Sequence, residues 1–212
     1  MPLPCTGSDL PDIPSIDCPP NVTRLDDCCK LVAIEDEILL YEKQSDRPYY
    51  WIVLQADEMP LSVCNLEAYA NSVAKNDEWM GRRCDYMAMG WAGGECCLLA
   101  IELRDRLTSE TQVANKFEQI EQSIEQIMAR IDTQIIGSPL FEQACASPDD
   151  YKVAGIVIAP AGIRKKSRSE RIHIIRTDTY SAAVAVMPPD RIHDCRLQWS
   201  DLMEMVGAKR SY

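Results

Sequence analysis

The stretch CDYMAMGWAGGECCLLAIELR, residues 84–104, decides the fold because it predicts a β-hairpin with charged residues at its open end. Two apolar runs flank Gly93-Gly94, and a two-residue hairpin turn of type I′ needs a positive φ at both central positions. Glycine adopts that conformation at little cost. With these two glycines as the turn, Asp85 faces Glu102 across the hairpin. Directly opposed residues on one face have Cβ atoms about 5 Å apart.

The open end of this hairpin brings two acids and a base together. Arg104 follows Glu102 by two residues, so both side chains point to the same face of the strand. Two opposed carboxylates repel each other unless a cation lies between them. Oxygen ligands at this separation suit Mg²⁺ or Mn²⁺, which are hard ions. The other interpretation is an ion pair between Arg104 and Asp85 with a purely structural role.

The segments around the hairpin predict an α/β protein. Residues 61–79 have apolar residues at helical spacing. The clearest helical periodicity follows Ser109, which can form a capping box with Gln112. A coiled coil would have the same stripe, but fewer than four heptads between strands favour packing against a sheet. The stripe consists of Val113, Phe117, Ile120, Ile124, Ile127 and Ile131.

Strands are predicted on both sides of these helices. Runs rich in β-branched and aromatic residues, or alternating between apolar and polar residues, are typical of strands. A closing helix is expected over residues 197–207. The segments 30–43 and 48–55 predict an antiparallel pair. The later predicted strands are 151–160, 171–178 and 181–188.

The hairpin resembles the site of the PD-(D/E)XK, or restriction-endonuclease-like, nuclease superfamily. In that family an acid at the start of one strand and an E-x-K at the end of its hairpin partner bind a divalent metal ion and cleave phosphodiesters. Here Asp85 matches the first acid, and Glu102-Leu103-Arg104 matches the E-x-K. The elements from 61 to 178 also follow the family's αβββαβ core order.

This resemblance implies a fold and an activity. The fold is a restriction-endonuclease-like αβββαβ core, with a mixed central sheet flanked by helices and an N-terminal β-hairpin extension. The activity is Mg²⁺- or Mn²⁺-dependent hydrolysis of DNA or RNA. Asp85, Glu102 and Arg104 would be the catalytic residues, and the two acids would bind the metal.

The sequence departs from the family pattern in ways that bear on activity. Arg104 replaces the usual lysine, and an arginine stays charged where a lysine can lose its proton. Lys116 on the following helix could supply the missing amine. Glu67 matches an additional metal-binding acid of many members, or it is a solvated helix residue. Gln119 matches a glutamine that some members carry, or it belongs to a polar helix face.

Three parts of one globular domain are expected. Residues 1–27 contain many prolines and are predicted to form an extended arm. Residues 28–60 form a β-rich extension, and residues 61–212 form the nuclease-like core. The segment EDEILLYE, residues 35–42, predicts an exposed strand edge that would pair with a second copy or a partner protein.

The formal net charge of −11 argues against a protein that coats nucleic acid through its overall charge. Contact with nucleic acid would instead use a local basic patch, metal ions or a partner. One candidate is the cluster between two predicted strands, which either contacts phosphates or keeps a hairpin tip soluble. This cluster comprises Arg164, Lys165, Lys166, Arg168 and Arg171.

The sequence predicts a cytoplasmic protein without membrane contact. The first residues lack the pattern of a signal peptide, and no apolar run reaches the roughly 18 residues of a membrane helix. Most of the ten cysteines are therefore expected to be reduced, buried thiols. Adjacent cysteines at 28–29 and 96–97 would point to opposite faces of a sheet. With two histidines and no C-x-x-C, a zinc site is not favoured, and His173 and His193 are expected to be structural.

Two classes of function remain open from the sequence. The first is the metal-dependent nuclease. The second is a catalytically inactive protein that keeps the nuclease-like fold as a binding or scaffold subunit, as Arg104 and the acidic charge would suit. Titration with Mn²⁺ separates them, because two opposed carboxylates bind the ion and a closed Asp–Arg pair does not.

Overall fold

The computed structural model describes most of the chain in nine segments. They are residues 5–42, 49–73, 81–130, 139–145, 151–159, 161–162, 172–177, 180–187 and 191–207. The basic cluster of Arg164, Lys165, Lys166, Arg168 and Arg171 lies outside the described residues, so its predicted role remains a prediction. None of the described helices is both long enough and apolar enough to cross a membrane.

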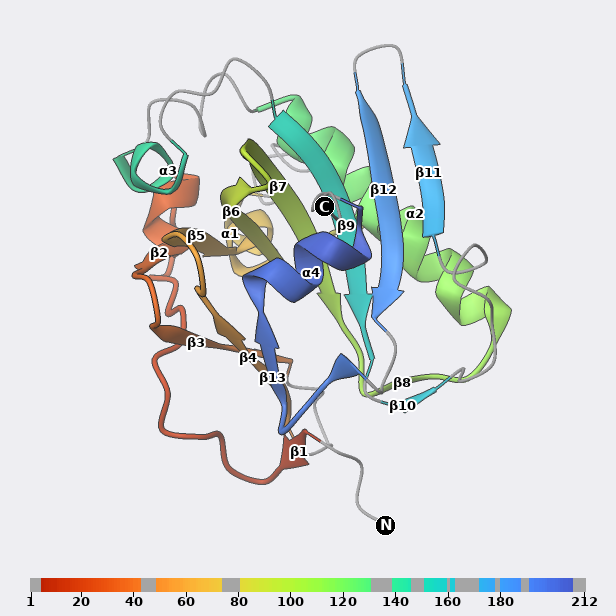
Figure 1. The fold of residues 1–212 in the computed structure, drawn as a ribbon, viewed down its shortest axis with the longest axis horizontal. Helices are drawn as coiled ribbons and strands as arrows, with labels where there is room; N and C mark the ends of the chain where they lie inside the picture. The colour runs from red at the N-terminus through yellow and green to blue at the C-terminus, as the bar shows by residue number, and fades with distance from the viewer. Residues whose placement is uncertain are drawn as a thin grey trace.

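A seven-stranded mixed sheet forms the centre of the molecule (Figure 1). Its strand order is β11-β12-β9-β7-β6-β5-β2. The pairs β7–β9 and β9–β12 are parallel, and the other neighbours are antiparallel. This arrangement confirms the predicted α/β class with a mixed sheet. The strands are β2 (Cys29–Val32), β5 (Leu61–Asn65), β6 (Tyr86–Ala92), β7 (Glu95–Leu103), β9 (Tyr151–Ile158), β11 (Ile172–Arg176) and β12 (Ser181–Met187).

Both faces of this sheet are covered, which gives the molecule three layers. In Figure 1, α2 crosses behind the sheet and α4 lies in front of it. Ile120 and Ile124 of α2 belong to the apolar cluster on one face, and Trp199 and Leu202 of α4 belong to the cluster on the other. The helices are α1 (Leu66–Val73), α2 (Glu110–Met128), α3 (Pro139–Ala144) and α4 (Trp199–Met205), with a 3₁₀ turn η1 (Leu25–Cys28).

A smaller sheet lies on the same side as α4. Its strand β4 pairs with β3 and β1 in antiparallel fashion and with β13 in parallel. A separate short parallel pair joins β8 and β10. These strands are β1 (Thr6–Gly7), β3 (Glu37–Glu42), β4 (Tyr49–Gln55), β8 (Arg106–Leu107), β10 (Ala161–Gly162) and β13 (Arg196–Gln198). The β3–β4 pair confirms an antiparallel pair within the expected segments 30–43 and 48–55. The first expected strand is split, because residues 30–32 belong to β2, which pairs with β5 in the central sheet and not with the extension.

The register of the β6–β7 hairpin is the one predicted from its glycines. Ala92 pairs with Glu95 next to the turn, and Tyr86 pairs with Ile101 near the open end. Gly93 and Gly94 have φ values of 61° and 83°, as a type I′ turn requires. This register places Asp85 and Glu102 at the same end of neighbouring strands.

Helix α2 is confirmed together with its N-terminal cap. The Ser109 side chain accepts a hydrogen bond from the backbone N–H of Gln112 at 3.2 Å. The side-chain oxygen of Gln112 accepts a hydrogen bond from the N–H of Thr108. In a standard capping box this donor would be the N–H of Ser109, one residue later. The cap fixes where α2 begins, and therefore which of its side chains face the sheet.

A glycine in β9 lets α2 lie close to the sheet. A Cβ added at Gly155 would collide with Cγ2 of Ile120 on α2. Ile120 is fully buried, so it has little room to move away. The close approach brings the first half of α2 within reach of the end of β7.

The expectation of one helix over residues 61–79 is wrong for its first part. Residues Leu61–Asn65 form strand β5, which pairs with β6 and β2. Leu61, Ser62 and Val63 are all buried, because a central strand covered on both faces need not alternate between apolar and polar residues. Helix α1 begins only at Leu66, after Asn65 caps it by accepting a hydrogen bond from the N–H of Ala68 at 3.0 Å.

The N-terminal arm is packed against the molecule, contrary to the expectation of an extended segment. Ile16 and Val22 are buried among core residues. The N–H of Leu39 donates to the carbonyl of Pro14 at 2.8 Å, and Ser15 forms a bridge to Leu39. The arm therefore contacts the edge of β3, which the sequence suggested was open to a partner.

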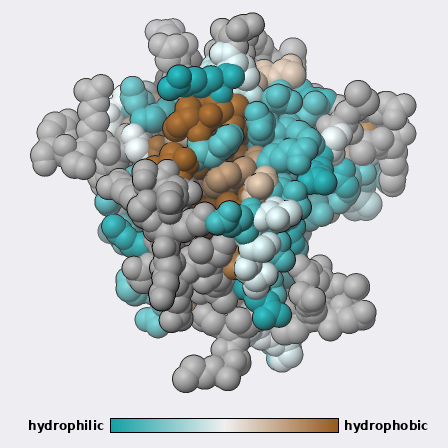
Figure 2. Space-filling view, turned by 90° about the vertical axis from the view of Figure 1, so that its right-hand side faces the viewer, coloured by the Kyte–Doolittle hydropathy of each residue, from teal (hydrophilic) through white to brown (hydrophobic). Residues whose placement is uncertain are grey.

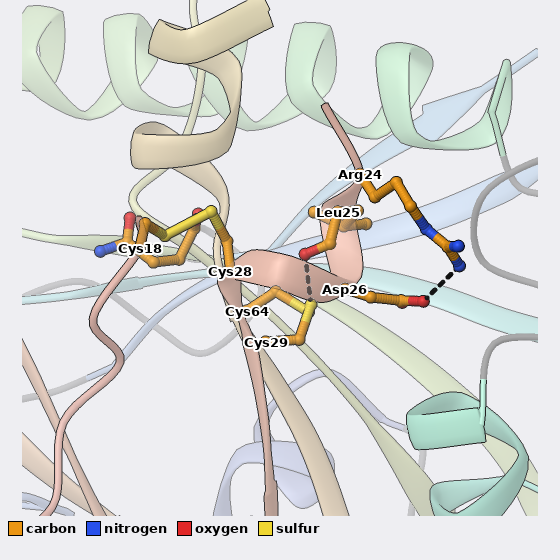
Figure 3. The surroundings of a disulfide bond; sticks show 8 residues. Cys18, Arg24, Leu25, Asp26, Cys28, Cys29 and Cys64 are labelled. Carbon is orange, nitrogen blue, oxygen red and sulfur yellow. Dashed lines mark hydrogen bonds and ion pairs between the residues drawn. A yellow bond between two sulfur atoms is a disulfide. The ribbon is translucent and has the colours of Figure 1, made fainter. Parts of the chain in front are cut away.

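The prediction that most cysteines are reduced is wrong. Eight of the ten cysteines form disulfides, and the two free thiols, Cys84 and Cys97, are buried. Figure 3 shows the cluster of two disulfides beside η1. Cys96 and Cys97 do point to opposite faces of β7, as expected, whereas Cys28 ends η1 and packs with Cys29 against the same apolar cluster. The pairs are Cys5–Cys195, Cys18–Cys28, Cys29–Cys64 and Cys96–Cys145.

One side of the molecule has an apolar patch surrounded by hydrophilic residues (Figure 2). It lies on the side of Figure 1 where β11 ends the sheet. Ile174 of β11 is 46% exposed, and its neighbour Ile172 is partly buried.

Candidate active site

Glu102 is the most enclosed charged residue of the candidate site. It lies near the end of β7, has no exposed surface, and points toward α2. Lys116 donates from Nζ to Glu102 Oε1 at 2.9 Å, and Gln119 donates from Nε2 to Oε2 at 2.7 Å. Lys116 Nζ also donates to Gln119 Oε1 at 2.7 Å. Both residues that the sequence offered only as alternatives therefore reach this carboxylate.

Arg104 connects Glu102 to the smaller sheet. Its Nη2 lies 2.7 Å from Glu102 Oε1, and its Nη1 lies 2.6 Å from Oε1 of Glu42 at the end of β3. These two salt bridges go to glutamates, and not to Asp85 as the structural interpretation predicted. Arg104 Nε is buried and has no hydrogen-bond partner among the described residues.

Asp85 is held in place by backbone groups. It is 7% exposed, and its Oδ2 accepts a hydrogen bond from the N–H of Leu103 at 2.6 Å. Its carbonyl oxygen accepts from the N–H groups of Leu66 and Glu67, at 3.0 and 3.1 Å. The start of α1 is thereby attached to the open end of the hairpin, and the Asp85 carboxylate has a fixed position.

The surroundings disfavour negative charge on both acids. Burial raises the pKa of Asp85, and the nearby carboxylates of Glu102 and Glu42 raise it further. Burial also raises the pKa of Glu102, although Arg104 and Lys116 act in the opposite direction. When all five groups are ionised, the three carboxylates and two cations carry a net charge of −1. The cluster therefore favours one further positive charge, as a proton or a metal ion.

Carboxylate oxygens are the ligands that a hard divalent ion prefers, although both oxygens of Glu102 already have cationic or amide partners. Mg²⁺ commonly binds to one or two carboxylates and completes its coordination with water and substrate phosphate. Asp85 and Glu102 provide two buried carboxylates of this kind. No group of three or more His, Cys, Asp or Glu side chains that could hold an ion occurs among the described residues. The Glu67 side chain is exposed, so its suggested role as a third ligand remains a prediction.

A pocket of about 370 Å³ adjoins these residues. We call it the basic pocket, because four cationic side chains line it together with three amides and one acid. Arg104, Lys116 and Gln119 belong to both the pocket and the Glu102 cluster. The lining residues are Arg82, Arg104, Asp105, Arg106, Leu107, Gln112, Asn115, Lys116 and Gln119.

Two residues of the site were missed from the sequence. Ser123 is buried on α2, accepts a hydrogen bond from the N–H of Cys84 at 2.7 Å and donates to the carbonyl of Gln119 at 2.8 Å. Its spacing of four from Gln119 and seven from Lys116 was a signal, because such residues share one helix face. Glu42 had no comparable signal, since its contact with Arg104 spans 62 residues.

The histidines lie outside this cluster. The ring of His173 stacks on Phe117 of α2, with centroids 5.6 Å apart. His193 forms a backbone bridge to Arg196. Neither contact gives the histidine a role in the candidate site.

Comparison with known proteins adds no relative. No protein-family model, curated protein or solved structure matches the chain.

Proposed function

We propose that the chain is a metal-dependent nuclease that hydrolyses phosphodiester bonds of DNA or RNA. The observation that carries this proposal is the meeting of Asp85 and Glu102 at neighbouring strand ends with Lys116 and Gln119 from the following helix. The sheet order supports it. Strands β5, β6 and β7 are consecutive and antiparallel, and β9 follows α2 and pairs in parallel with β7. Helix α1 lies between β5 and β6, so the main elements follow the order β5-α1-β6-β7-α2-β9. The hairpin, α2 and β9 match the ββαβ part of the core that the proposed function implies, and the place of α1 departs from the αβββαβ order expected from the sequence.

Asp85 and Glu102 would hold Mg²⁺ or Mn²⁺. The bound ion would lower the pKa of a water molecule and reduce the negative charge on the phosphate. Lys116 Nζ would supply the amine that Arg104 does not provide at the third position of the motif. Arg104 keeps its charge and orients Glu102 through their salt bridge. It would also place a positive charge close to the phosphate. Gln119 fixes Glu102 through its second carboxylate oxygen.

The test is cleavage of single- and double-stranded DNA and RNA with Mg²⁺ or Mn²⁺. Asp85→Asn and Glu102→Gln should each abolish cleavage, because each removes a charged ligand while keeping the size of the side chain. Glu95→Gln is the matched control, since Glu95 is an exposed acid at the turn end of the same hairpin. It should cleave like the wild type. Cleavage that survives in both site variants would refute the proposal.

A catalytically inactive binding or scaffold subunit is the second candidate. The observation that favours it is that Glu102 already has three cationic or amide partners, so the cluster is cohesive without an ion. This function predicts no cleavage by the wild type and a melting temperature that Mn²⁺ does not change. The nuclease predicts that Mn²⁺ raises the melting temperature of the wild type but not of Asp85→Asn.

The disulfides bear on where this activity takes place. The expectation of reduced cysteines followed from the predicted cytoplasmic location, and eight of the cysteines are paired in the structure. Disulfides form and persist mainly in oxidising compartments. We infer that the protein matures in such a compartment, and that its nucleic-acid substrate is met there or beyond it.

A further inference from the structure

The basic pocket contains cationic groups that the Glu102 cluster does not use. Arg104 and Lys116 form salt bridges to Glu102, but Arg82 and Arg106 do not contact that carboxylate in any described interaction. Arg82 precedes the hairpin, and Arg106 is in β8 directly after it. Two separate segments therefore bring guanidinium groups to the same pocket.

These two arginines can exchange their present partners at low cost. Arg82 Nη1 lies 3.5 Å from Glu118, and Arg106 Nε lies 3.9 Å from Asp105. The arginine side chains are 55% and 54% exposed. Exposed ion pairs of this kind contribute only about 0–1 kcal/mol. An anion entering the pocket would therefore meet two arginines whose existing contacts oppose it only weakly.

The chemistry of the pocket selects a phosphate. Four cationic groups and one acid line it, although the whole chain has a net charge of −11. Arg104 and Lys116 are paired with Glu102, so Arg82 and Arg106 are the groups offered to a ligand. Guanidinium groups match the geometry of phosphate oxygens and bind them through paired hydrogen bonds. Gln112 and Asn115 are exposed amides on the first turns of α2 that add neutral hydrogen-bonding groups. A pocket of about 370 Å³ is at the lower end of the range for small-ligand sites, about 300–1,000 Å³.

We propose that the basic pocket binds a phosphate group of the nucleic acid next to the phosphate that is cleaved. Arg82 and Arg106 make the contact, and Arg104 and Lys116 lie between this subsite and the two carboxylates. The inference rests on the proposed nuclease function, because it takes the phosphate at Asp85 and Glu102 as its reference. The pocket then sets the position of the nucleic-acid strand along the site. A phosphate held there determines which neighbouring phosphodiester bond reaches the two carboxylates.

The experiment measures binding of a fluorescent single-stranded oligonucleotide in EDTA, where no cleavage occurs. The test variant is Arg82→Gln with Arg106→Gln. The matched control is Arg24→Gln with Arg191→Gln, because these are also exposed arginines with acidic neighbours, Asp26 and Glu204. Both double variants change the net charge by the same amount, and only one of them alters the pocket.

We expect the pocket variant to bind about tenfold more weakly at low salt, and the control to bind like the wild type. The slope of log K against log salt should become shallower by about one in the pocket variant only, because one phosphate contact is lost. Equal affinities and equal slopes for the two double variants would overturn the inference.

Further measurements distinguish the phosphate subsite from the nuclease proposal and from a site for free phosphate. With Mg²⁺, the pocket variant should still cleave, but at positions less uniformly spaced from a labelled end, while the control keeps the wild-type pattern. A wild type that binds the oligonucleotide through the pocket but never cleaves would refute the nuclease and retain the phosphate subsite. Inorganic phosphate should compete only weakly with the oligonucleotide. A pocket that binds inorganic phosphate but no oligonucleotide would overturn the assignment to nucleic acid.

Discussion

The N-terminal region and the carboxylate site are both well buried, but different forces hold them. In residues 5–65, the disulfides Cys5–Cys195, Cys18–Cys28 and Cys29–Cys64 attach the arm, η1 and β2 to the rest of the chain. The site has no disulfide among its described residues. Its parts are connected by salt bridges and hydrogen bonds from Glu102 and Asp85.

The difference shows what each region is suited to do. A disulfide preserves its geometry regardless of pH, salt or ions, so it suits a segment whose position must not change with the solution conditions. An ionic cluster responds to protons and metal ions, because its side chains change partners when a group is protonated or when an ion binds. The first region should be sensitive to reductants, and the second to pH and divalent ions.

The largest effect is expected from removing the disulfide that joins the two ends of the chain. Cys5→Ser with Cys195→Ser opens a link with a sequence separation of 190 residues. The loop-entropy argument gives a loss of about 5 kcal/mol in the free energy of unfolding. Denaturant unfolding measures it. Cys97→Ala is the control, because it removes a buried free thiol and leaves all four links intact.

Thiol counting checks the same prediction chemically. The denatured, unreduced protein should have two reactive thiols, and the native protein should have none. Cys84 and Cys97 are buried, and burial raises the pKa of Cys97 to about 11, so little thiolate forms at neutral pH. Ten reactive thiols in the denatured protein would contradict the oxidised state.

Lys116→Met should destabilise the protein by about 3 kcal/mol, the lower end of the range for breaking a buried ion pair. The loss is limited because Arg104 still pairs with Glu102. Lys152→Met is the control, since its partner Glu95 is exposed and 3.9 Å away. Adding Glu102→Gln to Lys116→Met should restore most of the stability, because no unpaired buried charge then remains. Additive losses in denaturant unfolding would show that the two residues are not coupled.

Gly155→Ala should cost about 2 kcal/mol, the usual effect of overpacking a core. The added methyl group meets Cγ2 of Ile120 and pushes α2 away from β9. Nuclease activity should fall more than stability implies, because Lys116 and Gln119 move with the helix. In an Ile120→Leu background, which lacks that Cγ2 atom, the cost of Gly155→Ala should shrink. If Gly155→Ala costs the same stability in both backgrounds, the collision with Ile120 Cγ2 is not the cause of the loss.

The smallest effect, and the only one of opposite sign, is expected from Asp85→Asn in EDTA. The pKa of Asp85 is raised in the folded protein, so its ionisation costs stability as the pH rises from the unfolded to the folded pKa. The variant should therefore melt at a higher temperature than the wild type near neutral pH. The difference should disappear at acidic pH, where the wild-type carboxyl is protonated. A variant that melts lower at neutral pH would show that the charge stabilises the fold.

Local patterns in the sequence were sufficient for the hairpin and the helix after it. Gly93-Gly94 permits one turn and therefore one register, and the stripe of isoleucines with Ser109 defines α2. The boundary at Asn65 was missed because the apolar spacing of α1 continues into a buried strand. An asparagine that caps a helix was the available signal.

Long-range contacts could not be predicted in the same way. Glu42 meets Arg104 only because the smaller sheet packs against the end of β7, and nothing near Glu42 indicates that packing. The cysteines are similar, since eight of them allow 105 pairings and spacing alone does not choose among them. Lys116 and Gln119 could be named from their positions on α2, but their distance from Glu102 depends on Gly155 in a strand that follows.

The link between Cys5 and Cys195 makes most of the polypeptide a covalently closed ring. A protease that cuts one peptide bond inside this ring opens it without releasing a fragment. The two pieces remain joined, and the folded contacts across the cut are still made between parts of one molecule. A first cut inside the ring therefore leaves the molecule in one covalent piece, and separating the two parts needs either a second cut or a reductant.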